Sequence, residues 1–315
     1  MNEEPCWFGA DEGLFGVVSK PPEGISRRRQ GVILMNPGTL HRVGGARINV
    51  RLARQFAQLG YPSLRFDFSG LGDSAPREDG VTYLEGMIDE LRAAADLLLD
   101  KQECTEVILV GHCTGAAMSF EMALHDERVA GAVLIEGYAY PTARFQAVRW
   151  LRHVSSWSNW HGLLSGRKDA TPALRRLAGG VLGLVGTNGH ASGNGHDSGI
   201  EDTRRRIRSL EDLLPPREHV RAGLEALIGR KVRLLQVYAG GEHHYYNYRS
   251  QFADAFPGLD FKGMVEVEYQ REANHYFSTP AQQKWLDNRI LRWLTSFSCW
   301  LFVNGAYWVP DLGMI

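Results

Sequence analysis

Cysteine is scarce in this sequence, and charge of one sign is not in large excess. The chain has four cysteines in 315 residues, and no two of them lie at the Cys-x-x-Cys spacing of a metal site. A cysteine metal centre or a disulfide framework is therefore not expected, and we predict a reduced, cytoplasmic protein without a metal or cofactor. The formal net charge of −1 provides no general attraction to nucleic acid.

Long apolar runs are missing as well. Residues 1–7 are acidic and lack the apolar segment of a secretory signal. The apolar and aromatic segment 298–315 is too short and too interrupted to cross a membrane. With 44% hydrophobic and 23% charged residues, the composition is typical of a soluble globular protein, and we expect no transmembrane segment.

Strand-like and helix-like segments alternate through the first part of the chain. Short apolar runs that suit buried strands lie at 31–35, 61–66, 107–111 and 129–136. Between them, residues 46–59 and 82–100 have apolar side chains at helical spacing. The alternation resumes at Lys231, with strand-like runs at 232–238 and 264–269 and a closing helical segment at 280–297. This order predicts a mostly parallel central sheet flanked by helices.

The alternation stops between residues 138 and 230, which contain no convincing strand. We predict an inserted helical cap there, with a mobile loop at 186–199, because that Gly-, Asn- and His-rich tract has no apolar anchor. The core is then expected in two parts, 1–137 and 231–297, followed by the apolar tail 298–315. Basic residues outnumber acidic ones in the insertion, which is therefore expected to attract anionic partners.

The segment Gly111-His-Cys-Thr-Gly115 joins an aliphatic strand to a helix that begins with small residues. A Gly-x-nucleophile-x-Gly turn of this kind presents one reactive side chain at its apex, and the two glycines avoid crowding in a strained turn. Cys113 is therefore the predicted nucleophile, at a position where serine is usual. His112 is expected to pack beneath the turn, and it is also a weak candidate for the substrate pocket.

A nucleophile in such a turn needs a base and an acid that orients the base, each placed after a late strand. His275 lies in the loop after the last strand, and we predict that it accepts the thiol proton. Glu242 follows the preceding strand and is the predicted acid of the triad. Glu136, at the end of an earlier core strand, could reach the same histidine and stays an alternative.

The oxyanion hole is expected to use two backbone N–H groups. One is the N–H of Thr114, at the start of the helix after the nucleophile. The other comes from the loop after the first core strand, where Pro37 has no N–H to donate, so Gly38 or Thr39 is predicted. Asp67, in a glycine-rich turn, is expected to have a structural role.

Four motifs together resemble the α/β-hydrolase superfamily over nearly the whole chain. They are Asn36-Pro-Gly, Arg65-Phe-Asp-Phe-Ser-Gly-Leu-Gly-Asp-Ser74, Gly111-His-Cys-Thr-Gly115 and Ala273-Asn-His-Tyr-Phe277. More narrowly, the chain resembles the hydrolases associated with the exosortase A system, which also carry cysteine at the elbow. The segments that carry this narrower likeness are His41-Arg-Val-Gly44, Ala143-Arg-Phe-Gln-Ala147 and Trp160-His-Gly-Leu-Leu-Ser-Gly-Arg167. Thr114-Gly115 departs from the Asp-Ala of those proteins, so the resemblance implies an α/β-hydrolase fold and a cysteine nucleophile but no substrate.

Sulfur as the attacking atom favours acyl transfer. A cysteine at a helix N-terminus and beside a histidine is readily a thiolate, and its acyl-enzyme is itself a thioester that keeps the acyl group activated. We therefore predict a thioesterase or acyltransferase with a CoA or acyl-carrier-protein thioester as donor, attracted by the basic insertion. Trp150, Trp157 and Trp160 would line an acyl pocket or close a small core within the cap.

Two other functions stay open at this point. One is an ester or lactone hydrolase of the dienelactone-hydrolase type, which would need neither CoA nor a carrier protein. The other is a non-catalytic scaffold that binds a ligand or partner. Reactivity of Cys113 separates the scaffold from the two enzymes, because only a catalytic cysteine needs an activated thiolate.

Overall fold

A computed structural model describes residues 2–155, 214–241 and 245–300. Its centre is an eight-stranded sheet in the order β1-β2-β4-β3-β5-β6-β7-β8. The strands are β1 (Asn2–Phe8), β2 (Leu14–Lys20), β3 (Gln30–Met35), β4 (Ser63–Phe66), β5 (Glu106–His112), β6 (Val129–Ile135), β7 (Arg233–Ala239) and β8 (Val265–Gln270). Pairing is antiparallel from β1 to β4 and parallel from β4 to β8. The mostly parallel sheet predicted from the sequence is confirmed, and the carboxyl ends of its parallel strands share one edge.

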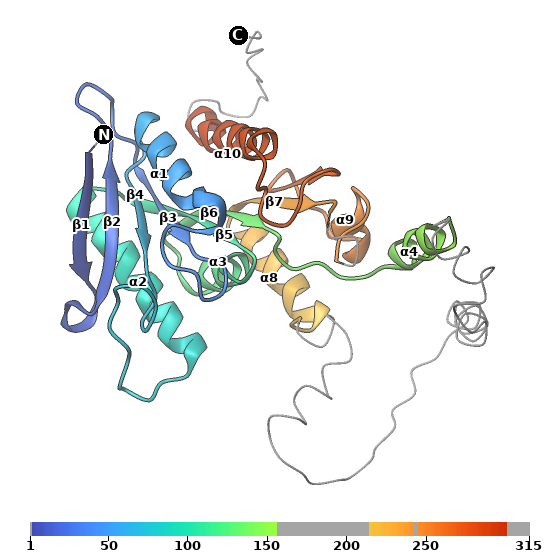
Figure 1. The fold of residues 1–315 in the computed structure, drawn as a ribbon, viewed down its shortest axis with the longest axis horizontal. Helices are drawn as coiled ribbons and strands as arrows, with labels where there is room; N and C mark the ends of the chain where they lie inside the picture. The colour runs from blue at the N-terminus through green and yellow to red at the C-terminus, as the bar shows by residue number, and fades with distance from the viewer. Residues whose placement is uncertain (1, 156–213, 242–244, 301–315) are drawn as a thin grey trace, which may run out of the picture.

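Helices cover both faces of this sheet (Figure 1). One face packs against α1 (Ile48–Gln58) and α10 (Pro280–Trp300), the other against α2 (Tyr83–Gln102), α3 (Thr114–His125) and α8 (Arg217–Gly229). The remaining helices are η1 (Ala10–Glu12), η2 (Gly45–Arg47), α4 (Ala143–Ser155) and α9 (Gln251–Ala255). In β5, Leu109 is buried in one core, and Ile108 and Val110 are buried in the other. Burial on both faces explains why the central strands are continuous aliphatic runs.

The predicted insertion 138–230 begins with α4 and ends with α8 in the described residues. α8 packs on the core, since an added Cβ at Gly223 would lie 2.6 Å from the Phe120 ring of α3. Residues 156–213, including the predicted loop 186–199, and residues 301–315 of the tail lie outside the described residues. Within the described part of the chain, no helix has the length and apolar character needed to cross a membrane.

Asp67, directly after β4, joins two loops at the carboxyl edge of the sheet. Its buried carboxylate accepts hydrogen bonds from the Arg42 backbone N–H at 2.5 Å, from the Arg42 guanidinium, and from the Asp73 backbone N–H at 3.2 Å. The Arg42 guanidinium also pairs with the Asp73 carboxylate at 2.7 Å and lies over the Phe15 ring. These are contacts of a structural residue that fixes the loop leading from β3 to α1.

Replacing Asp67 with asparagine is expected to lower the free energy of unfolding by about 2 kcal/mol or more, because Arg42 loses its buried anionic partner. The matched control is Asp73→Asn. Its carboxylate binds the same guanidinium but is 59% exposed, so the expected cost is about 0.5 kcal/mol or less. Urea unfolding followed by circular dichroism measures both, and equal losses would contradict the role given to Asp67.

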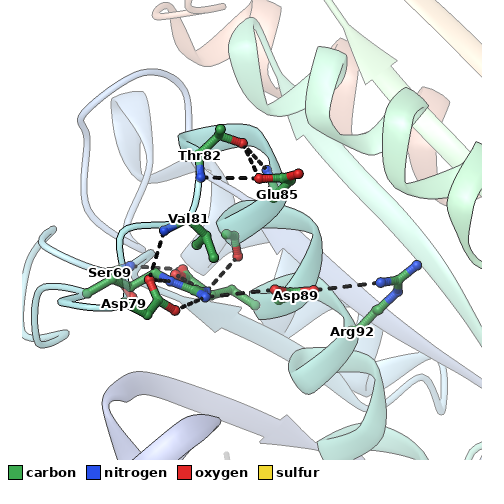
Figure 2. Close-up of polar contacts among 10 residues, drawn as sticks. Ser69, Asp79, Val81, Thr82, Glu85, Asp89 and Arg92 are labelled. Atoms are coloured by element: carbon green, nitrogen blue, oxygen red, sulfur yellow. Dashed lines mark hydrogen bonds and ion pairs between the residues drawn. The ribbon is translucent and has the colours of Figure 1, made fainter.

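The loop after β4 is also tied to the start of α2 (Figure 2). Thr82 caps the helix: its hydroxyl accepts from the Glu85 N–H at 3.4 Å, and the Glu85 carboxylate accepts from the Thr82 N–H at 3.3 Å. The buried Glu90 accepts from the Ser69 N–H at 2.9 Å and pairs with Arg77 at 3.4 Å. The glycine-rich turn after β4 is therefore held by the loop between β3 and α1 on one side and by α2 on the other.

Candidate active site

Cys113 is the apex of a sharp turn between β5 and α3. Its backbone has φ 58° and ψ −118°, a left-handed φ that non-glycine residues adopt at a cost and that recurs at functional sites. An added Cβ at Gly111 would lie 2.1 Å from the Gly115 carbonyl oxygen, and one at Gly115 would lie 2.8 Å from the Asn36 carbonyl oxygen. Both glycines are thus required by close backbone approach, as the sequence predicts.

His275 lies in the loop after β8 and connects the turn to a carboxylate. Its Nδ1 is 3.5 Å from Oε2 of Glu136. Hydrogen bonds to Cys113 first and to Glu136 second raise the pKa of His275 to about 10, although burial acts in the opposite direction. Because Nδ1 faces Glu136, Nε2 is the ring nitrogen left for Cys113. The described residues therefore bring a thiol, an imidazole and a carboxylate into one chain of hydrogen bonds.

Glu136 is held tightly at the end of β6. Its N–H donates to the Val237 carbonyl at 2.8 Å, and its Oε1 accepts a hydrogen bond from the Ala239 N–H. The carboxylate is fully buried, and the residue has φ 54°, a conformation that costs energy for a residue with a side chain. Tyr245 donates from its hydroxyl to the carbonyl of the next residue, Gly137, at 2.5 Å. A strained, buried carboxylate held in this way is well suited to orient His275.

Glu242, the first choice for the acid from the sequence, lies outside the described residues, as do Trp157 and Trp160. Trp150 is described on α4, where its side chain is 46% exposed. The signal for Glu136 in the sequence is its place at the end of an aliphatic strand, followed by a glycine. Glu242 likewise follows a core strand, β7, although it comes after two glycines and not before one, so the sequence alone leaves both open.

The predicted oxyanion-hole residues Gly38 and Thr114 lie together. The Gly38 N–H donates to the Thr114 hydroxyl at 2.5 Å, and the space around the Gly38 Cα is open. Thr114 is the first residue of α3, where a backbone N–H has no partner within its own helix. In the described part of the chain, no hydrogen bond joins Thr39 to the elbow. The arrangement therefore favours Gly38 over Thr39 as the second donor.

His112 is 3% exposed, and its ring lies beside that of His275. Its Nε2 lies 2.8 Å from the His275 backbone carbonyl oxygen, and the two ring centroids are 4.8 Å apart. Burial first and the charge on His275 second lower the pKa of His112 to about 4, so its ring is neutral near pH 7. The sequence predicts His112 beneath the turn but gives no sign of its contact with the loop of His275.

One family model matches part of this chain. Residues 29–175 match the family model described as serine aminopeptidase, S33. No curated protein matches the sequence at a significant level.

Solved structures match over almost the full chain. An α/β serine hydrolase without a lid from Xanthomonas campestris has 15% identity and a TM-score of 0.53, with 94% of this chain and 95% of that chain covered. An α/β serine hydrolase homologue from Coxiella burnetii has 16% identity and a TM-score of 0.52, with 93% and 98% covered. An esterase from Pyrococcus furiosus has 13% identity and a TM-score of 0.53, with 94% and 91% covered. At these identities the likeness shows the fold alone.

Proposed function

Because the chain has the α/β-hydrolase fold that its sequence predicts, we propose that it is an acyl-transfer enzyme, a thioesterase or acyltransferase that works through Cys113. The observation that carries the proposal is the contact of Cys113 with His275, which raises the pKa of that histidine to about 10. An imidazolium beside the sulfur stabilises a thiolate, which is the nucleophilic form of cysteine. The proposed triad is Cys113, His275 and Glu136, with Glu242 as the alternative acid.

The proposed reaction has two halves. In the first, the Cys113 thiolate attacks the carbonyl carbon of an acyl thioester, and the donor thiolate leaves with a proton from His275. The acyl group is then bound to Cys113 as a thioester. In the second, neutral His275 takes a proton from water or from an acceptor, which attacks the same carbonyl carbon and releases the Cys113 thiolate. Glu136 holds the imidazole in the tautomer and orientation that both halves need.

The backbone N–H groups of Thr114 and Gly38 are the proposed oxyanion donors. Both must face the oxygen that becomes negative in the tetrahedral intermediate. The Thr114 hydroxyl accepts the Gly38 N–H at 2.5 Å in this structure. A substrate oxygen would replace that hydroxyl as the acceptor, so the donor is already aimed at an oxygen before substrate arrives.

A thioester donor is favoured because the acyl-enzyme is a thioester as well. Transfer between two sulfur atoms is close to balanced in energy, and the acyl group stays active toward a second acceptor. Coenzyme A and acyl carrier proteins are both anionic, and arginines of the insertion such as Arg144 and Arg149 of α4 would increase the rate of encounter with either. The narrower resemblance to the hydrolases associated with the exosortase A system stays a prediction.

Hydrolysis of an ordinary ester or lactone is the second candidate. It is favoured by the structural likeness to an esterase from Pyrococcus furiosus. Such an enzyme would release its acyl group to water from any activated ester, with no preference for a CoA or carrier thiol. The two candidates share the proposed nucleophile and differ in the leaving group that they accept.

Intact-mass spectrometry with a panel of acyl-CoA and acyl-carrier donors tests the proposal. The protein is expected to gain the mass of one acyl group, most clearly in His275→Ala, where loss of the base slows release. A parallel panel of p-nitrophenyl esters identifies the ester hydrolase, which would turn over these esters and none of the thioesters. No adduct and no turnover with either panel, together with Cys113 alkylation no faster than a model thiol, would support the non-catalytic scaffold instead.

A further inference from the structure

We propose that His112 is a positioning residue: its Nε2–H holds the backbone of the catalytic base, His275, at the correct distance from Cys113. The inference rests on the proposed role of Cys113 and His275 and adds a second histidine to that site. His112 is the last residue of β5 and precedes Cys113 directly. It therefore connects the strand of the nucleophile to the loop of the base.

The hydrogen-bond geometry defines the tautomer of His112. Its Nε2 lies 2.8 Å from the carbonyl oxygen of His275, a residue 163 positions away in the chain. A carbonyl oxygen can only accept, so Nε2 must carry the hydrogen. In the described residues, the buried Nδ1 has no hydrogen-bond partner. A bare lone pair there is tolerated better than an N–H would be, because a buried unpaired donor loses its water without compensation.

The charge on His275 also favours a neutral His112 ring. The rings of His112 and His275 are 4.8 Å apart between centroids, and Tyr276 lies edge-on to both, at 5.5 Å and 5.0 Å. A second imidazolium at this distance would oppose the charge on His275, and burial lowers the pKa of His112 to about 4. A neutral donor is thus required at this position, which a lysine or arginine could not supply.

The hydrogen bond from His112 restrains His275, the proposed catalytic base. The loop after β8 is tied to the loop after β7 by a hydrogen bond from the Gly241 N–H to the Ala273 carbonyl at 2.7 Å. Tyr276 of the same loop packs against η2, since an added Cβ at Gly45 would lie 2.7 Å from its ring. Between these contacts, His112 holds the carbonyl of His275 itself. Without it, the imidazole would sample positions farther from the sulfur, and the thiolate–imidazolium pair would be populated less.

Two substitutions replace the imidazole of His112 with an amide and differ in whether that amide can reach the His275 carbonyl. Glutamine can place its amide N–H near the Nε2 position, whereas asparagine carries the same amide on a chain shorter by one methylene group. The measurement is the pH profile of iodoacetamide alkylation at Cys113, followed on its own peptide by mass spectrometry so that the other cysteines do not interfere.

His112→Gln is expected to alkylate within about threefold of the wild type. His112→Asn is expected to be at least about tenfold slower near pH 6.5 and to recover at higher pH, because a small displacement of a catalytic group is costly. Wild-type rates in His112→Asn, or equal losses in both variants, would overturn the proposal. A wild-type Cys113 no more reactive than a free thiol would instead contradict the proposed function.

A measurement on the unaltered protein gives a test that does not depend on folding of the variants. Nitrogen-15 NMR at pH 7 should show His112 neutral, with hydrogen on Nε2 and a free lone pair on Nδ1. Observation of the opposite tautomer or of a doubly protonated ring would overturn the assignment of His112 as a neutral donor.

Discussion

Glu136→Gln is expected to lower the rate of Cys113 acylation by on the order of 10³-fold, while Glu242→Gln changes it by about threefold or less. The reason is the orientation of Glu136. Its Oε1 accepts from the Ala239 N–H, and its Oε2 faces Nδ1 of His275 at 3.5 Å. In a glutamine, the amide oxygen would keep the Ala239 contact, and the amide NH₂ would then face the imidazole.

A donor at that position selects the wrong tautomer of His275. Nδ1 would become the acceptor, Nε2 would carry the hydrogen, and the neutral ring could no longer take a proton from Cys113 or from the second acceptor. Because the backbone contacts of Glu136 remain, folding should change little, and circular dichroism provides that check. Single-turnover acylation with a reactive thioester measures the effect. The opposite ranking, with Glu242→Gln impaired and Glu136→Gln active, would transfer the role of the acid to Glu242.

Alkylation of Cys113 is expected to lower the pKa of His275 from its value of about 10. The direction of this pKa change follows from the groups that surround His275. The hydrogen bond to Cys113 is the largest of the influences that raise this pKa, and it disappears when the sulfur becomes a neutral thioether. Glu136 continues to raise the pKa and burial continues to lower it, so the group moves toward its ordinary range near 6.5.

This shift is what the proposed reaction requires. His275 must be protonated while Cys113 is a thiolate, and it must be neutral once Cys113 is acylated, so that it can accept a proton in the second half. A carboxamidomethyl group imitates the acylated sulfur in lacking charge. NMR titration of the His275 ring before and after treatment with iodoacetamide follows the change directly. An unaltered pKa would mean that Cys113 does not control the protonation of His275, and Cys113→Ala provides a second neutral reference.

Much of the architecture could be predicted from the sequence because it depends on local patterns. Aliphatic runs alternating with amphipathic segments indicate a parallel sheet, and the glycines at 111 and 115 indicate a turn into which no Cβ fits. The predicted α/β-hydrolase fold is confirmed by the solved structures that match the chain. Cys113 and His275 were identified as candidates in the same way, by position after strands.

Which glutamate orients His275 depends on distances between residues that are far apart in the chain, and a local sequence pattern does not contain such distances. Glu136 and Glu242 both follow parallel strands, so either is consistent with the order of the chain. What favours Glu136 is its φ of 54° and its hydrogen bond from Ala239, which together turn the carboxylate toward His275. The contact of His112 with the His275 carbonyl likewise joins residues 163 positions apart and follows from the fold alone.

In the proposed reaction Cys113 holds the acyl group as a thioester, and the residue that carries the acyl group can be identified directly. After incubation with an acyl thioester and rapid acid quench, the peptide that contains Cys113 is expected to carry the acyl mass and to lose it in neutral hydroxylamine, which cleaves thioesters readily. The same treatment of Cys113→Ala should give an unmodified protein. An acyl group found on another residue, or one stable to neutral hydroxylamine, would contradict the account.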